Sequence, residues 1–165
     1  MRQVLLSVAA LIISTAVLLA GNSLQFVILG LRADAEGFSL TSIGAMTAAY
    51  YVGYAVGTLR APELVAAIGH IRAFAALGSL TSGVVLAHAL WVDPVFWSVL
   101  RVLTGLCFAG LATVVESWMN GRATREIRGR LLAVLSMAAI GGYAVGPLFA
   151  TLASVDGRGT PGEND

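Results

Sequence analysis

A long apolar run over about residues 4–31 is the feature that most constrains this chain. At 1.5 Å per residue, a helix of that length crosses about 30 Å of hydrocarbon with room for tilt. Further apolar runs follow, separated by short polar stretches. We expect all of them to be membrane spans, at about residues 4–31, 40–59, 71–90, 94–119 and 131–152. The chain is therefore predicted to be an all-α membrane protein with five transmembrane helices.

The composition supports a lipid environment and excludes several other functions. Hydrophobic residues make up 58% of the chain and charged residues only 12%, whereas soluble domains carry about 25% charged residues. A soluble chain of 165 residues could not bury so much apolar surface. The net charge of +1 and the few basic residues between spans give no nucleic-acid site. Cys107 is alone, and no catalytic triad, carboxylate pair or zinc spacing is present, so we expect no enzyme, metal or cofactor.

The first run could also be read as a secretory signal peptide, because Arg2 gives it a positive start. It is longer than the ~7–15 apolar residues of such peptides and lacks a clear small-x-small cleavage site. We therefore prefer a membrane span. At the other end, residues 155–165 are polar and rich in Gly, and we expect a disordered tail after a bundle over residues 1–154.

Arginine predicts the orientation, because the sequence contains no lysine. The segments before, between and after the spans lie alternately on the two sides of the membrane. The segments of one side hold two arginines, Arg32 and Arg158. The segments of the other side, which include the amino terminus, hold seven: Arg2, Arg60, Arg72, Arg122, Arg125, Arg128 and Arg130. Segments rich in arginine stay in the cytoplasm. We expect a multi-pass membrane protein, with the amino terminus in the cytoplasm and the carboxyl terminus outside.

Polar side chains within the spans are the candidates for a solute or proton pathway. Arg101 lies about seven residues into the fourth run, roughly 10 Å from its outer end. Burial of a guanidinium is costly and often marks such a pathway, although Arg101 could instead reach the outer surface. Asn22 and Gln25 should face other helices or a wet cavity. Tyr50, Tyr51 and Tyr54 of the second run could also line a cavity, and Tyr54 is our pathway candidate among them. His88, near the outer end of the third run, is read as an interfacial anchor.

Small residues follow Arg101 at four-residue spacing, at Gly105 and Ala109. They share one helix face, where a neighbouring helix can approach closely. This Arg-x-x-x-Gly-x-x-x-Ala pattern resembles the fourth-helix motif of the major facilitator superfamily. Residues 114–118 and 128–133 are similar to a little-characterised bacterial branch of it. This resemblance implies a location in the bacterial inner membrane.

The segment between the second and third runs resembles that family's loop signature in part. It keeps the glycine at Gly69 and a basic residue at Arg72, but Ala66 and Ala67 replace the family's Asp-Arg pair. By resemblance, Glu116 could pair with Arg72 and latch the cytoplasmic side. The alternative for Glu116 is a solvated carboxylate at the membrane interface.

The fifth run contains Gly142-x-x-x-Gly146-Pro147. This resembles the superfamily motif associated with proton-coupled antiporters, although the family's following glycines are replaced by Ala150 and Thr151. A helix kink that serves packing is the alternative.

The resemblance covers nearly the whole chain and implies an incomplete six-helix half of a transporter. Transporters of this kind have two six-helix bundles around a central site. We therefore expect the amino-terminal part of a transporter for a small solute, inactive alone and lacking a carboxyl-terminal half. An anionic solute, a drug and proton coupling are all compatible with Arg101. The alternative is a small membrane protein that transports nothing and acts as a packing or assembly partner.

Overall fold

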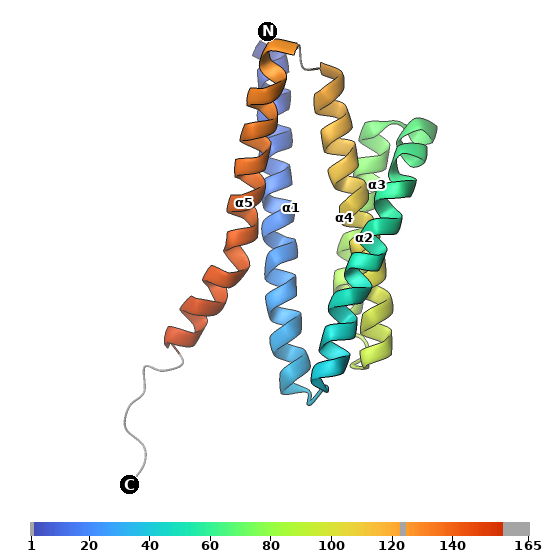
Figure 1. Ribbon diagram of the computed structural model, residues 1–165, viewed down its shortest axis with the longest axis vertical. Helices are drawn as coiled ribbons and strands as arrows, with labels where there is room; N and C mark the ends of the chain where they lie inside the picture. The colour runs from blue at the N-terminus through green and yellow to red at the C-terminus, as the bar shows by residue number, and fades with distance from the viewer. Residues whose placement is uncertain (1, 123–124, 157–165) are drawn as a thin grey trace. The chain divides into compact units, whose positions relative to one another are not determined.

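The structure is a computed structural model that describes residues 2–122 and 125–156, with side chains described for residues 12–121 and 129–152. Within these ranges the chain forms helices and no strand, which confirms the all-α class (Figure 1). The helices are α1 (Arg2–Ala35), α2 (Leu40–Ile68), α3 (His70–Ala87), α4 (Pro94–Arg122) and α5 (Arg125–Asp156). The expected number of five helices is confirmed for the described part of the chain.

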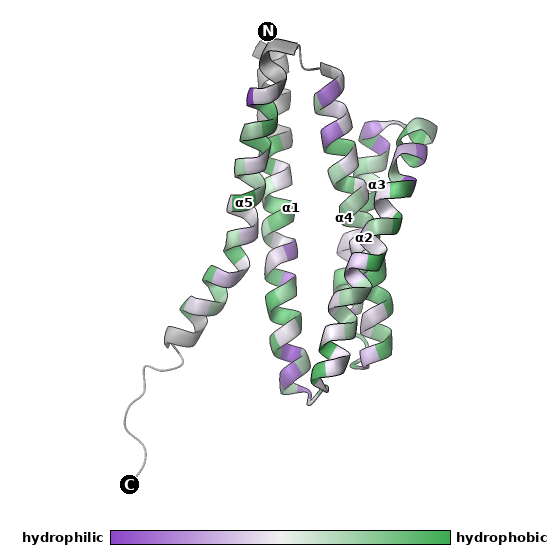
Figure 2. Ribbon diagram, in the orientation of Figure 1, coloured by the Kyte–Doolittle hydropathy of each residue, from purple (hydrophilic) through white to green (hydrophobic). Residues whose placement is uncertain are grey.

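Four of these helices are long and apolar enough to cross a membrane. The qualifying segments are Ile12–Ala35, His70–Ala87, Pro94–Gly121 and Gly129–Leu152. Helix α2 has the length, at 29 residues, but tyrosine, threonine and glycine dilute its aliphatic content, and Figure 2 shows the pale stretches that result. That α2 crosses the membrane therefore stays a prediction, because its composition alone does not establish it.

Helix α2 continues well past the predicted end of its span at residue 59. It runs through Pro62 to Ile68, and the expected loop reduces to Gly69, whose φ of +81° ends one helix and begins the next. Glycine tolerates that conformation without the Cβ clash that other residues meet. At the other end of α2, the Ser39 hydroxyl accepts a hydrogen bond from the Ser42 amide (3.2 Å) and caps the helix.

The chain divides into two structural units, which are described separately. The α1–α5 unit contains α1 as far as Leu31 and α5 from Gly129 onward. The α2–α4 unit runs from Arg32 to Arg128 and contains α2, α3 and α4. Within the second unit, α4 packs against both α2 and α3 and supplies much of the buried apolar surface.

Candidate functional site

The closest helix contact of the α2–α4 unit is a crossing of backbones at glycine. A Cβ atom added to Gly57 would lie 2.5 Å from the carbonyl oxygen of Leu106 and 2.8 Å from the Ala109 Cβ. A Cβ on Gly53 or Gly105 would overlap a carbonyl oxygen of the facing helix, that of Val102 or Tyr50 respectively. Small residues on both helices thus allow a close approach of this kind.

Arg101 lies beside this crossing and is almost fully buried. Its side chain is 2% exposed, and its guanidinium carbon lies 4.8 Å from the centroid of the Tyr50 ring. Tyr50 itself is 3% exposed and contacts the ring of Tyr54, with centroids 6.1 Å apart. A cation over an aromatic face gains about 2 kcal/mol when both groups are desolvated. The tyrosine ring therefore offsets part of the cost of burying the guanidinium.

Of the three tyrosines that could line a cavity, Tyr50 is the one that contacts Arg101, whereas Tyr54 is the one selected as a pathway candidate. The signal was present, because Tyr50 precedes Gly53 and Gly57 by three and seven residues and therefore shares their helix face. Which of the neighbouring tyrosines meets Arg101 depends on the register of α2 against α4. Sequence spacing within one helix does not give that register.

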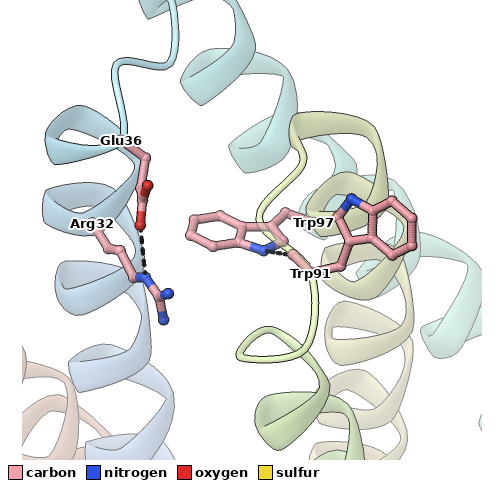
Figure 3. Close-up of polar contacts among 4 residues, drawn as sticks. All are labelled: Arg32, Glu36, Trp91 and Trp97. Atoms are coloured by element: carbon pink, nitrogen blue, oxygen red, sulfur yellow. Dashed lines mark hydrogen bonds and ion pairs between the residues drawn. The ribbon is translucent and has the colours of Figure 1, made fainter.

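A second cluster lies at the end of the α2–α4 unit where α4 begins (Figure 3). Trp97 is fully buried and donates a hydrogen bond from Nε1 to the Trp91 carbonyl (2.8 Å). The guanidinium carbon of Arg32 lies 5.7 Å from the Trp97 ring centroid, and the Arg32 Nε lies 3.5 Å from a carboxylate oxygen of Glu36. Both charged side chains are about 40% exposed, so this ion pair contributes little to stability.

His88 belongs to the same cluster, and its expected role as an interfacial anchor is wrong. The side chain is 4% exposed and its ring lies 6.0 Å from that of Trp97. Its Nδ1 donates to the Val84 carbonyl (2.9 Å), because a carbonyl can only accept. Trp97 covers the imidazole, while Trp91 remains 70% exposed.

The opposite end of the unit holds Gly69, Arg72 and Glu116. A cavity of about 460 Å³ is lined there by residues 68–72 and by part of α4. The His70 ring and the Ser117 hydroxyl share a hydrogen bond (3.1 Å) across it. Both Arg72 and Glu116 are exposed, and no ion pair joins these two described side chains. The latch expected between them is absent from this arrangement.

In the α1–α5 unit, Gly146 of α5 lies against Ser23 of α1, and Pro147 follows it on the exposed side of α5. The Ser23 hydroxyl donates to the Tyr143 carbonyl (2.6 Å) and accepts from the Gly146 amide (3.2 Å). The sequence reasoning missed Ser23. A proline in a helix predicts that the carbonyl four residues earlier lacks its usual amide donor. It does not predict which residue of another helix will donate a hydrogen bond instead.

Asn22 and Gln25 belong to α1 as far as Leu31, whereas Arg101 belongs to the α2–α4 unit. Asn22 is 1% exposed. The amide nitrogen and oxygen of Gln25 are buried without a hydrogen-bond partner among the described residues. The pairing of these amides with Arg101 therefore stays a prediction.

The helices and their buried arginine define a multi-pass membrane protein. The model of the Major Facilitator Superfamily matches residues 11–159. The chain belongs to this superfamily.

Three similar proteins are each named uncharacterized MFS-type transporter YcaD, from the Escherichia coli strains S88, ED1a and E24377A. Each is 26% identical over 155 residues, which cover 94% of this chain and 40% of the relative. The chain thus spans about two fifths of the length of these relatives. No solved structure gives a significant match.

Proposed function

We propose that this chain is the amino-terminal part of a transporter that moves a small solute across the bacterial inner membrane. Its match to the superfamily over residues 11–159 supports transport in general. Its coverage of 40% of the similar transporters supports the idea that a further half exists. Because major facilitator sites lie between two bundles, the chain should not transport by itself.

One observation carries the proposal beyond family membership. Arg101 of α4 is buried, and its guanidinium lies against the ring of Tyr50 of α2. An ionisable residue inside a membrane span is retained at a cost of at least a few kcal/mol and usually serves ions or substrates. We propose that Arg101 faces the interior of the complete bundle and contacts the solute or a coupled proton path. Tyr54, Asn22 and Gln25 are the proposed polar companions on that path.

We expect Arg101→Ala to abolish transport in the full-length protein and to leave membrane insertion intact. Arg101→Lys should restore little, because a lysine cannot reproduce the planar guanidinium contact with Tyr50. The measurement compares cells that carry each variant against a panel of labelled solutes and toxic compounds, with membrane levels followed by immunoblot.

Arg60→Ala is the matched control for Arg101→Ala. Arg60 is an arginine of α2 whose side chain is 74% exposed and pairs with Glu63, so its loss should change transport little. Full activity in Arg101→Ala would show that the arginine only reaches toward the surface. A coding sequence with no further apolar spans beyond Asp165 in any frame would instead favour a small non-transporting protein.

We propose that the latch between Glu116 and Arg72 forms in a different state of the complete transporter from the one described here. Each single reversal, Glu116→Arg or Arg72→Glu, should lower transport by about fivefold, the scale of an exposed ion pair. The double reversal should recover most of that loss. The same transport measurement tests it, with Arg60→Glu as the control. A double variant no better than either single one would remove the latch from the proposal.

A further inference from the structure

Pro147 leaves one backbone carbonyl of α5 without its helical donor. Proline has no N–H, so the carbonyl four residues earlier, at Tyr143, cannot form the usual i→i−4 bond. In a membrane span no water is available to replace it. The structure supplies a donor from another helix, because the Ser23 hydroxyl of α1 lies 2.6 Å from that carbonyl oxygen.

Many hydroxyls of the described residues bond within their own helix, although the Ser117 hydroxyl, like that of Ser23, bonds to a distant residue, His70. Among the described residues, eight other Ser and Thr hydroxyls donate to the carbonyl four residues earlier on their own helix. They are Thr47, Thr58, Thr81, Ser82, Ser98, Thr104, Thr113 and Thr151. Such a bond within the helix was equally available to Ser23. Its hydroxyl instead reaches a residue 120 positions away, at the carbonyl that Pro147 exposes.

The backbone around this contact leaves room for nothing larger than glycine. A Cβ on Gly146 would lie 2.5 Å from the Ser23 carbonyl oxygen, and one on Gly142 would lie 2.7 Å from the Ala16 carbonyl oxygen. This close approach also brings the Gly146 amide within 3.2 Å of the Ser23 hydroxyl. The hydroxyl therefore donates to one backbone group of α5 and accepts from another.

We propose that Ser23 is a positioning residue that replaces the missing amide hydrogen of Pro147 and fixes α5 against α1 at that point. The hydroxyl satisfies the open carbonyl, and the two glycines let α1 come close enough for it to do so. This inference does not depend on the proposed transport function, since it concerns only the pairing of the two helices. It assigns to the Gly146-Pro147 pair a specific partner.

A double-mutant cycle between Ser23 and Pro147 tests the proposal on the full chain in lipid bilayers. Ser23→Ala should lower the ratio of folded to unfolded protein by about three- to twentyfold, the range for hydrogen bonds between membrane helices. In a Pro147→Ala background the new amide can bond to the Tyr143 carbonyl within the helix. There, Ser23→Ala should have a clearly smaller effect, because only the hydrogen bond from the Gly146 amide is still lost. Ser23→Thr should retain most of the stability, because it keeps a hydroxyl.

The NMR resonance of the Tyr143 carbonyl provides a second measurement. It should change if the Ser23 hydroxyl donates a hydrogen bond to that carbonyl, but not if Ser23 only fills space. Labelling tyrosine carbonyls and alanine nitrogens selects two Tyr–Ala pairs, 54–55 and 143–144. In solid-state NMR spectra, Ser23→Ala should shift the Tyr143 carbonyl resonance, and the Tyr54 carbonyl serves as an internal control. With Pro147→Ala also present, Ser23→Ala should cause no such shift.

Two results would overturn the proposal. One is an equal loss of stability from Ser23→Ala in both backgrounds, which would mean that Ser23 contributes only packing. The other is a Tyr143 carbonyl resonance that Ser23→Ala leaves unchanged. If Ser23→Ala alone fails to accumulate, recovery on addition of Pro147→Ala is the expected result, and failure to recover contradicts the proposal.

Discussion

Replacing Gly105 with leucine should prevent the folded protein from accumulating in the membrane. Any Cβ at this position would overlap the Tyr50 carbonyl oxygen and lie 2.9 Å from the Tyr54 amide nitrogen. These are backbone atoms of α2 and cannot rotate away, so the two helices must separate. Separation also removes the contact between Arg101 and Tyr50. Overpacking typically costs about 1–3 kcal/mol even where side chains can adjust, and here the backbone must move.

The experiment compares membrane levels and chromatographic behaviour of leucine variants at matched glycines. Gly44 of α2 and Gly121 of α4 have no atom within 4 Å of an added Cβ, so Gly44→Leu and Gly121→Leu should accumulate normally. Gly110→Ala should be mild, because its added Cβ meets the end of the flexible Leu77 side chain (2.6 Å). A Gly105→Leu protein with normal level and elution would show that the two backbones are not closely packed.

The helices could be predicted from the sequence because each membrane span requires a long run of apolar residues. The sequence predicts a second span that ends near residue 59, and helix α2 continues beyond it to Ile68. The polarity of Arg60 and Glu63 favours a loop, but these residues form an exposed ion pair on the continuing helix (3.6 Å). Polarity does not end a helix, whereas the positive φ of Gly69 does.

Contacts within one helix were easier to predict than contacts between helices. The four-residue spacing puts Arg101, Gly105 and Ala109 on one face, and that spacing is visible in the sequence. The partners of that face, Tyr50 above all, depend on how α2 is placed along α4. The burial of His88 likewise depends on Trp97, which packs against it from another helix.

We also expect all five helices to cross the membrane, with the amino terminus in the cytoplasm. The seven-to-two distribution of arginines supports this orientation. Helix α2 is the decisive element, because it alone among the five falls outside the segments apolar enough to span in the described part of the chain. Its glycine face packs on α4, which is long and apolar enough to cross the membrane, so we expect α2 to cross together with α4.

Reporter fusions at the junctions between helices measure this directly, with alkaline phosphatase active outside and a fluorescent protein active inside. Fusions after Gly37, Leu90 and Asp165 should report outside, and those after Gly69 and Gly121 should report inside. Opposite signals at Gly37 and Gly69 are the result we expect, since they show that α2 crosses the membrane. If those two fusions reported the same side, or if the fusion after Asp165 reported inside, the chain would not form five spans of a major facilitator transporter.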